Sequence, residues 1–460
     1  MSARRQKENQ CKLPLSAGPK GEAPKTPMEG TGALMAKGGD ESPGGTERLM
    51  EEVCERENLK EALRRVRVNG GSPGVDGMRV EELGGYLKDN WPKIREQLLS
   101  GTYQPQPVRR VEIAKPDGGT RKLGIPTVLD RFVQQAVMAV LQGRWDRTFC
   151  EQSYGFRPNR SAHQAVAKAQ EYLAEGNRWV VDIDLEKFFD RVNHDMLMGR
   201  VAKRVDDKRL LKLIRAFLNA GVMENGLVGP TDEGTPQGGP LSPLLSNLVL
   251  DDLDRELGQR GHRFVRYADD CNIYVRSERA GKRVMESVSG FITKKLKLKV
   301  NGEKSAVARP WERKFLGFSF TSGYPARRRI APKAVDRFKR RVRELTRRTR
   351  GVSLERRAAE LAVYLRGWRG YFGYSQSPTF LKELDAWVRR RLRAAIWKQW
   401  KHGPARLREL RRRGASDRLA QWAAFSARGP WCMSQNTAVR TALPESYFRS
   451  LGIPFLGDAT

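Results

Sequence analysis

The sequence predicts an α+β fold in which a mixed region of strands and helices is followed by a basic helical region. From about residue 103 to 320, alternating strands such as Val108–Ala114 are interspersed with helical stretches such as Val128–Leu141. From Lys333 to Arg413 the helical pattern dominates. Residues 326–413 hold 28 basic and 7 acidic residues, so this segment carries a charge of +21. That is about two thirds of the net charge of the chain, which is +33. We therefore expect a domain boundary near residue 326.

Composition excludes several classes of protein. A hydrophobic content of 39% and 10 Trp indicate a buried core, and a charge of +33 favours a polyanionic partner, nucleic acid before an anionic membrane surface. No apolar run reaches the roughly 18–20 residues that span a bilayer, and the first 30 residues lack the apolar block of a secretory signal. The five cysteines form no C-x-x-C pair and there are only four His, which favours a reducing cytosol and leaves a zinc nuclease without ligands.

The first hundred residues separate into two parts. Residues 1–46 contain 8 Gly and 5 Pro and are expected to be a flexible leader. From Glu47 onward, apolar residues at helical spacing predict short amphipathic helices, broken at Asn69-Gly70-Gly71. Residues 47–102 are therefore interpreted as an N-terminal extension of the mixed region.

Two adjacent acids occupy the turn of a predicted hairpin. Phe264–Tyr267 and Cys271–Val275 are strand-like, and Asp269 and Asp270 lie at or beside the turn between them. Adjacent carboxylates repel each other and are costly near a strand core without a cation. An isolated Asp-Asp pair is nevertheless more often a simple turn.

A second acidic strand favours a metal site. Trp179–Leu185 is apolar except for Asp182 and Asp184, which alternate on one face, and it leads into Phe188–Asp195, interpreted as the start of a helix. If Asp184 converges with Asp269 and Asp270, the result is an oxygen-rich site suited to two Mg²⁺ and to nucleotidyl transfer. The Gly- and Pro-rich loop 234–243 precedes a predicted helix at Leu244–Leu257 and is either a ligand loop or a structural connection.

The ordered set of motifs resembles a family. Asp184 with Phe188-Phe189-Asp190, the loop 235–243, Tyr267-Ala268-Asp269-Asp270 and Lys314–Phe318 stand in reverse-transcriptase order. Over roughly residues 47–460, the sequence resembles bacterial group II intron-encoded reverse transcriptase/maturases of the type without an H-N-H nuclease. Further motifs that carry this resemblance are Ser72–Gly77, Leu123–Pro126, Ser153–Pro158 and Asn301–Ser305.

The resemblance implies a right-hand polymerase fold. Fingers and palm would occupy residues 103–325, the palm being an antiparallel sheet backed by helices, and a helical thumb, also called the maturase or X domain, would occupy 326–413. Residues 414–460 resemble a short DNA-binding extension. An H-N-H nuclease needs histidines, and His402 is the last histidine of the sequence, so no such domain is expected after the thumb.

The resemblance also implies roles for individual residues. Asp184, Asp269 and Asp270 would bind two Mg²⁺, with Mn²⁺ as a possible substitute, whereas Asp182 does not match a metal position. The expected dNTP-binding residues are Lys115, Arg121, Phe189 and Gln237, with Lys304 as a further candidate near the site. Phe189 would crowd the sugar 2′ position, although a plain core aromatic is the alternative. Ala114 stands where relatives commonly have Pro, which puts the stiffness of the fingers hairpin in question.

The basic run on the predicted thumb is the expected RNA contact, with a solvated charged face as the alternative. It consists of Arg389, Arg390, Arg391 and Arg393. Tryptophans at helical spacing in the same region are expected mainly in the core.

Three functions fit these features. The first is an RNA-directed DNA polymerase of the bacterial cytosol, associated with the nucleoid on target DNA, that uses intron RNA, a DNA or RNA primer and dNTPs and also assists splicing. The second is a maturase with a vestigial polymerase site. The third is a retron, diversity-generating or defence-type reverse transcriptase, which the long basic domain disfavours.

Overall fold

The structure, a computed structural model, describes residues 45–114, 120–224, 227–229, 234 and 238–458. The chain divides into two compact units, one over 38–326 and one that contains Arg327–Thr460. Each unit has a hydrophobic core of its own.

The first unit begins with helices that pack around α4 and α8. The predicted break after Asn69 is confirmed, because α2 ends there and Gly70 and Gly71 adopt φ of 58° and 106°. The helices of this part are α1 (Leu49–Val53), α2 (Arg56–Asn69), α3 (Leu83–Ser100), α4 (Val128–Trp145) and α8 (Lys208–Asn219).

The same unit contains a four-stranded sheet in the order β2-β1-β4-β5, whose first two strands precede α4 and whose last two follow α8. Its strands are β1 (Val108–Ala114), β2 (Thr120–Ile125), β4 (Val222–Glu224) and β5 (Leu227–Gly229). The expected fingers hairpin that begins at Val108–Ala114 is confirmed, since β1 and β2 pair antiparallel from Arg109↔Ile125 to Ala114↔Thr120. Strand β4 joins β1 in parallel through Val108↔Val222.

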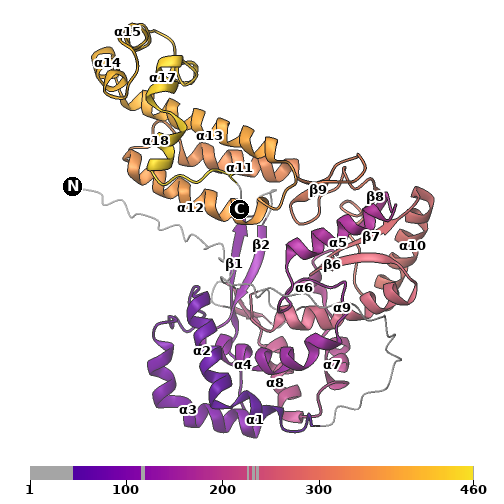
Figure 1. Ribbon diagram of the computed structural model, residues 1–460. Helices are drawn as coiled ribbons and strands as arrows, with labels where there is room; N and C mark the ends of the chain where they lie inside the picture. The colour runs from indigo at the N-terminus through magenta and orange to yellow at the C-terminus, as the bar shows by residue number, and fades with distance from the viewer. Residues whose placement is uncertain (1–44, 115–119, 225–226, 230–233, 235–237, 459–460) are drawn as a thin grey trace, which may run out of the picture. The chain divides into compact units, whose positions relative to one another are not determined.

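The second sheet of this unit is antiparallel throughout, in the order β6-β7-β3-β8. Its strands are β3 (Trp179–Ile183), β6 (Arg263–Tyr267), β7 (Asp270–Val275) and β8 (Ala306–Ala308). Helices α5 (Ala162–Ala174), α9 (Ser242–Gln259) and α10 (Glu278–Lys294) contact these strands (Figure 1). Helix α10 comes close because Gly281 lacks a Cβ, which would lie 2.5 Å from Val307 Cγ1. The predicted antiparallel palm sheet backed by helices is therefore present.

The helix expected from Phe188 onward is broken. Helix α6 (Phe188–Arg191) ends after four residues, Val192 is extended, and α7 (His194–Ala202) begins after Asn193. The Asn193 side chain accepts a hydrogen bond from the Met196 amide at 2.9 Å, so it caps α7. An N-cap side chain inside an apparently continuous pattern restarts the helix in a new direction.

Strand β9 (Phe318–Phe320) follows a tight turn at the Lys314–Phe318 motif. Phe315 and Phe318 exchange backbone hydrogen bonds of 2.8 and 2.9 Å, and Leu316 and Gly317 between them have φ of 52° and 81°.

The second unit is helical after the short strand β10 (Arg328–Ile330). Its helices are α11 (Pro332–Leu345), α12 (Leu354–Phe372), α13 (Pro378–Gln399), α14 (Gly403–Arg412), α15 (Asp417–Ala424), α16 (Pro430–Met433), α17 (Thr437–Ala442) and α18 (Glu445–Ser450). Trp368 and Trp397 are buried, as expected for core tryptophans, and the Trp368 ring lies 4.4 Å from that of Phe338. The Asp385 carboxylate accepts hydrogen bonds from the amides of Leu456 and Gly457, at 2.9 and 2.8 Å, and so fixes the end of the chain to α13.

Candidate active site

The turn between β6 and β7 carries two of the three candidate carboxylates. Tyr267 pairs with Asp270, so that Ala268 and Asp269 form a two-residue turn. Ala268 has a φ of 57°, a left-handed conformation that a non-glycine residue adopts only when its surroundings hold it there. The turn therefore holds Asp269 at its tip and Asp270 at the start of β7.

The register of the sheet brings the third carboxylate to the same edge. Strands β3 and β7 pair from Trp179↔Val275 to Ile183↔Cys271, and one further step of this register places Asp184 opposite Asp270. The Asp184 amide donates to Ser305 Oγ at 3.0 Å, and its carbonyl accepts from the Asn301 amide at 2.8 Å. The motif at Asn301–Ser305 thus fixes the backbone of Asp184.

Lys304 lies beside this carboxylate. Its Nζ is 3.8 Å from Asp184 Oδ1, and 64% of the lysine side chain is exposed. The structure therefore brings Lys304 to the candidate site, as the sequence suggested, in a loose and solvated ion pair.

Electrostatic crowding is concentrated on Asp270. The pKa of this carboxyl is raised to about 7, first by burial of the group and then by repulsion from Asp269, Asp182 and Asp184. Asp270 also keeps a solvent-exposed surface, so a cation could reach it. Among the described residues, no three His, Cys, Asp or Glu side chains are already gathered in a metal-binding geometry. The donor chemistry fits a hard divalent cation, because carboxylate oxygens that repel one another gain from a shared positive charge.

Asp182 has a different environment on the same strand. Arg313 forms an ion pair with its Oδ2 at 2.6 Å, and the Asn272 amide nitrogen lies 3.0 Å from its Oδ1 once the amide is oriented to donate. Burial raises the pKa of Asp182, and the positive charge of Arg313 opposes the shift. The structure thus gives Asp182 protein partners, whereas the sequence could only note its departure from the metal position.

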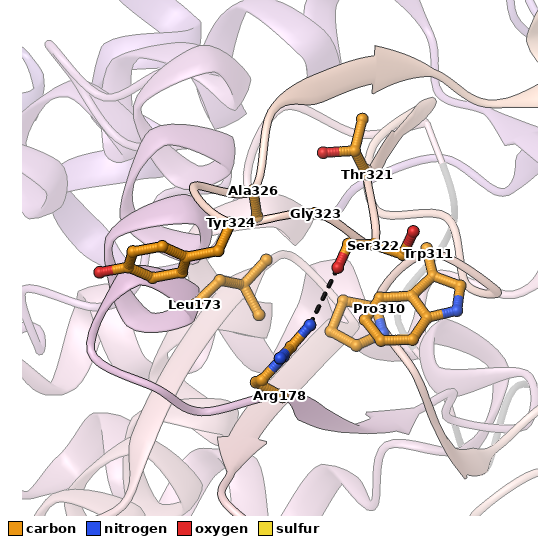
Figure 2. Close-up of a pocket in the computed structure, with 9 residues that line it drawn as sticks. All are labelled: Leu173, Arg178, Pro310, Trp311, Thr321, Ser322, Gly323, Tyr324 and Ala326. Atoms are coloured by element: carbon orange, nitrogen blue, oxygen red, sulfur yellow. Dashed lines mark hydrogen bonds between the residues drawn. The ribbon is translucent and has the colours of Figure 1, made fainter.

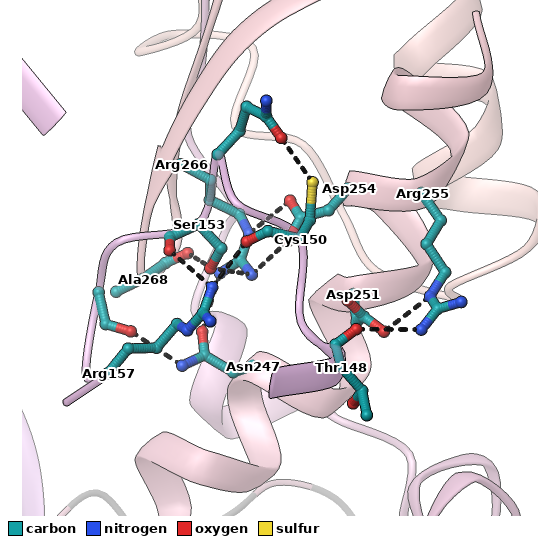
Figure 3. Close-up of polar contacts among 12 residues, drawn as sticks. Thr148, Cys150, Ser153, Arg157, Asn247, Asp251, Asp254, Arg255, Arg266 and Ala268 are labelled. Carbon is teal, nitrogen blue, oxygen red and sulfur yellow. Dashed lines mark hydrogen bonds and ion pairs between the residues drawn. The ribbon is translucent and has the colours of Figure 1, made fainter. Parts of the chain in front are cut away.

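A buried arginine supports the turn from below, and the sequence analysis missed it. Arg266 is 1% exposed and forms a bidentate ion pair with Asp254, at 2.7 and 2.5 Å (Figure 3). Its Nη1 donates to the carbonyl oxygen of Ala268 at 2.9 Å and to Asn247 Oδ1 at 3.0 Å, and its Nη2 donates to Ser153 Oγ at 2.7 Å. This side chain links the turn carbonyl to helix α9. One signal was available, since Arg266 follows the apolar pair Phe264-Val265 inside β6, and an arginine buried there needs an acidic partner.

The Ser153–Pro158 motif packs on the same turn. A Cβ at Gly155 would lie 2.2 Å from the Ala268 amide nitrogen, so only glycine fits there. The Gly155 carbonyl accepts from Asn247 Nδ2 at 2.8 Å, and the Tyr154 amide donates to the Arg266 carbonyl at 2.9 Å. The motif therefore serves the geometry of the turn.

Phe189 is half-buried on α6, with its ring 5.2 Å from that of Phe188. The backbone behind it is tightly packed, because a Cβ at Gly234 would lie 2.8 Å from the Phe189 carbonyl oxygen. Gly234 is held by its amide, which donates to the Val192 carbonyl at 2.8 Å, and by its carbonyl oxygen, 2.5 Å from His194 Nε2. The start of the Gly- and Pro-rich loop thus lies directly against α6.

Three of the expected dNTP-binding positions cannot be placed. Lys115 and Gln237 lie outside the described residues, and so does the side chain of Arg121, whose backbone belongs to β2. The neighbouring Gly238 is described, and a Cβ there would lie 2.5 Å from the Gly124 carbonyl oxygen. The loop after Gln237 therefore approaches the Leu123–Pro126 motif closely.

A small hollow elsewhere in this unit is too small for a nucleotide. It has a volume of about 20 Å³, which is room for one water molecule, and Trp311 and Tyr324 are among its lining residues (Figure 2). Arg178 crosses it and donates to the Ser322 carbonyl at 2.9 Å.

The arginine run on α13 is turned toward the protein. Arg389 pairs with Glu445 at 3.1 Å, and Arg390 lies 3.9 Å above the Trp431 ring. Arg391 donates to Thr346 Oγ1 at 3.1 Å, and Arg393 donates to the Leu443 carbonyl at 2.9 Å. Burial lowers the pKa of Arg393 to about 10. The run that was expected to form an exposed RNA-binding edge is half-buried and holds the C-terminal helices on α13.

Three exposed basic residues of this unit share one face of α11. Lys333, Arg337 and Arg340 follow one another at spacings of four and three, and all three are exposed. The opposite face of α11 buries apolar side chains such as Val335 and Phe338. We call these three residues the α11 basic stripe; none of them forms an ion pair with a described carboxylate.

None of the helices in the described ranges is long and apolar enough to cross a membrane.

Two families match the chain in consecutive segments. The reverse transcriptase (RNA-dependent DNA polymerase) family matches residues 113–320, and the group II intron maturase-specific domain matches residues 335–414. The first match contains the carboxylate edge, and the second contains α11 to α14.

Three relatives illustrate the similarity. The chain is 35% identical to protein YkfC of Escherichia coli (strain K12) over 301 residues, 57% of this chain and 79% of YkfC. It is 40% identical to the group II intron-encoded protein LtrA of Lactococcus lactis subsp. cremoris over 191 residues, 41% of this chain and 32% of LtrA. It is 31% identical to the putative COX1/OXI3 intron 2 protein of Saccharomyces cerevisiae over 231 residues, 49% of this chain and 25% of that protein. The matched segment is therefore about a third of LtrA.

Proposed function

This chain belongs to the family of group II intron-encoded reverse transcriptases and maturases, and we propose that it copies intron RNA into DNA at the carboxylate edge of β3 and β7. Its enzymatic class is that of an RNA-directed DNA polymerase, which binds an RNA template. We further propose that it uses a DNA or RNA primer and dNTPs, reaches target DNA during intron mobility, and binds intron RNA to assist splicing. We place this activity in the bacterial cytosol and, on target DNA, at the nucleoid.

The observation that carries the proposal is the convergence of Asp184, Asp269 and Asp270. Asp184 follows β3, and Asp269 and Asp270, 85 positions later in the chain, lie at the turn into β7. The antiparallel pairing of β3, β7 and β6 brings them to one edge of the sheet. Reverse transcriptases use divalent metal ions, and we propose that these three side chains hold two Mg²⁺, with Mn²⁺ as a substitute. Bound there, the ions would lower the pKa of the primer 3′-hydroxyl and neutralise charge on the leaving pyrophosphate.

The chain's own residues position the reactants. Asp269 and Asp270 supply the negative charge, and Arg266 holds their turn without reaching the solvent edge. Lys304 would partly balance the charge of Asp184 before substrate arrives. Phe189 is proposed to crowd the sugar 2′ position, because its half-buried ring lies against that of Phe188 and its backbone packs against Gly234.

The remaining dNTP roles are proposed from the resemblance. Lys115 and Arg121 flank the turn between β1 and β2, where cations would suit an incoming triphosphate. Gln237 is proposed to line the nucleotide and template pocket, beside a loop that packs on Gly124.

For RNA binding we propose the α11 basic stripe as the main phosphate contact within residues 326–413. Its three cations are exposed, whereas Arg389, Arg390, Arg391 and Arg393 are half-buried in intramolecular contacts. Phosphate binding supplies most non-specific affinity for nucleic acid and needs accessible cations. Arg391 of the α13 arginine run would help to hold α11 in place through its hydrogen bonds to Thr346 Oγ1 and to the Arg343 carbonyl.

Primer extension on an RNA template with dNTPs and Mg²⁺ tests the polymerase assignment. We expect extension by the wild-type protein and a loss of at least roughly 10³-fold in Asp269→Ala, because a metal ligand contributes several kcal/mol of transition-state stabilisation. The matched control is Asp182→Asn on the neighbouring strand, which is expected to retain extension.

Two results would contradict the assignment. Normal primer extension by Asp269→Ala would show that the carboxylates do not take part in catalysis. Failure of the wild-type protein to extend any primer, with RNA binding intact, would favour a maturase with a vestigial polymerase site. A retron, diversity-generating or defence-type role would be favoured if the RNA flanking the coding sequence held no group II intron domains.

A further inference from the structure

His194 is a buried histidine that the polymerase assignment does not yet use. It is the first residue of α7, it is 3% exposed, and both of its ring nitrogens face oxygen atoms. Nε2 lies 2.5 Å from the Gly234 carbonyl oxygen, and Nδ1 lies 3.2 Å from Asn219 Oδ1. Because a carbonyl oxygen can only accept a hydrogen bond, Nε2 carries a proton and donates to Gly234. The ring therefore ties α7 to the residue at which the Gly- and Pro-rich loop begins.

Gly234 joins His194 to helix α6. Its amide donates to the Val192 carbonyl at 2.8 Å, so both backbone polar groups of Gly234 are bound by residues 192–194. Its φ of 92° lies in the left-handed region that favours glycine, and a Cβ would lie 2.8 Å from the Phe189 carbonyl oxygen and 2.9 Å from Asp190 Cα. Gly234 therefore fits against the backbone of α6, and the hydrogen bond from His194 holds it there.

Helix α6 depends on such contacts for its position. It has four residues, which is about one turn, and a helix this short is not stable by itself in water. Lys187 before it has a φ of 48°, and Val192 after it is extended. Phe188 is buried in the core, whereas Phe189 is only half-buried. The placement of the Phe189 ring therefore follows from how the α6 backbone is packed, and Gly234 is part of that packing.

We propose that His194 is a positioning residue for sugar selection, which fixes through Gly234 the single helical turn that presents Phe189 to an incoming nucleotide. This role rests on the proposed function, because it assumes that Phe189 crowds the sugar 2′ position. A ring that excludes one hydroxyl group has to be held to within about 0.5 Å. Without the hydrogen bond from His194, the Gly234 backbone and α6 can shift, and ribonucleotides enter more easily.

Single-nucleotide primer extension on an RNA template tests the proposal. The value of kcat/KM is measured for a dNTP and for the matching ribonucleotide, and their ratio gives the discrimination. His194→Asn keeps a polar group near the Nδ1 position but has none at Nε2, whereas the amide nitrogen of His194→Gln replaces Nε2. We expect the discrimination to fall roughly tenfold in His194→Asn, the effect of one buried hydrogen bond whose acceptor is left unpaired. His194→Gln should retain most of it.

A control on the same helix separates positioning from general loss of stability. Leu197 is 1% exposed on α7, so Leu197→Val removes buried packing there. This variant is expected to lower the melting temperature and to discriminate between the two sugars like the wild type. Circular dichroism melting of all variants shows which of them are folded and by how much each is destabilised.

Hydrogen–deuterium exchange tests the anchor without any DNA synthesis. The Gly234 amide donates to Val192, so its exchange reports whether the loop stays on α6. Mass spectrometry with fragmentation of the peptide that contains residue 234 follows this amide. It should exchange at least roughly tenfold faster in His194→Asn than in the wild type, and at nearly the wild-type rate in His194→Gln.

The proposal is overturned if His194→Asn extends primers with wild-type discrimination, or if His194→Gln loses as much discrimination as His194→Asn. It is equally overturned if the Gly234 amide exchanges at the same rate in the wild type and in His194→Asn. Failure of the wild-type protein to extend a primer with dNTPs would instead contradict the polymerase assignment, and the role in sugar selection with it. The two failures are distinguishable because the exchange of Gly234 does not depend on activity.

Discussion

The carboxylate edge of the palm sheet and helix α13 treat like charges in opposite ways. At the edge, burial and repulsion from Asp269, Asp182 and Asp184 raise the pKa of Asp270 to about 7. On α13, each arginine of the run has a separate partner, a carboxylate, a ring, a hydroxyl or a carbonyl. The arginine run is nearly contiguous in the sequence, whereas Asp184 lies 85 positions before Asp269.

The difference indicates which charges are available to a ligand. Repulsion that the fold leaves in place can be relieved by a cation, so it marks a place where one is expected. Charges that already have protein partners lose those contacts if they bind something else. We therefore look for ligands at the palm edge and on the α11 basic stripe, and assign α13 a structural role.

The largest effect is expected when the buried partner beneath the palm edge is removed. Arg266→Met leaves Asp254 buried and unpaired, and we expect the unit to lose about 3–5 kcal/mol of stability. Urea unfolding measures this loss. The matched control is Arg263→Met on the same strand, where the ion pair with Glu175 is exposed and worth about 0–1 kcal/mol.

A double variant sharpens this test. Arg266→Met with Asp254→Leu removes both charges and should recover much of the stability, because no charge is left buried. The turn at Ala268 would still lack the donor to its carbonyl, so primer extension should stay low although the fold is restored. Equal losses in Arg266→Met and Arg263→Met would contradict the supporting role of Arg266.

The sequence predicted the carboxylate edge of the palm sheet better than it predicted the buried arginine, Arg266, that holds the turn there. The alternation of acids in Trp179–Leu185 and the Asp-Asp turn follow from the period of two in a strand, and the observed register joins them. The role of Arg266 could not be predicted in full, because its partners Asp254, Asn247 and Ser153 come from distant segments. A local pattern reports which face a residue occupies and not what packs against it.

The helical unit was harder to predict for the same reason. Charge density alone suggested an exposed edge at Arg389–Arg393, whereas the half-buried state of these side chains depends on the segment after Arg413. The break between α6 and α7 was also missed, since the Asn193 cap lies inside an apparently continuous helical pattern. The dNTP roles of Lys115, Arg121 and Gln237 stay predictions.

The salt dependence of RNA binding compares the two basic groups directly. Replacing Lys333, Arg337 and Arg340 together by Gln is expected to reduce the slope of log K against log salt by about 2 to 3, since each lost phosphate contact contributes about 0.7 to 0.9. Filter binding over a salt series measures the slope. Gln at Arg389, Arg391 and Arg393 should instead lower the melting temperature with little change in slope. A reduced slope in the α13 variant and an unchanged slope in the α11 variant would instead assign RNA binding to α13.

The smallest effect concerns the stability of the palm edge itself. In EDTA at pH 8, above the raised pKa of about 7, Asp270 is ionised and its repulsion opposes folding. Asp270→Asn should therefore be more stable than the wild type, by at most about 1 kcal/mol because solvent screens part of the repulsion. At pH 5 the wild-type carboxyl is largely protonated, so the advantage of the variant should disappear.

Addition of Mg²⁺ should reverse the order at pH 8. The wild type is expected to gain melting temperature as the cation relieves the repulsion, whereas Asp270→Asn, with one ligand fewer, should gain much less. Asp182→Asn is the control: it disturbs the ion pair with Arg313 and should be less stable than the wild type with or without Mg²⁺. If Mg²⁺ stabilised Asp270→Asn as much as the wild type, the crowding at this edge would not be a cation site, and the contrast with α13 would lose its functional meaning.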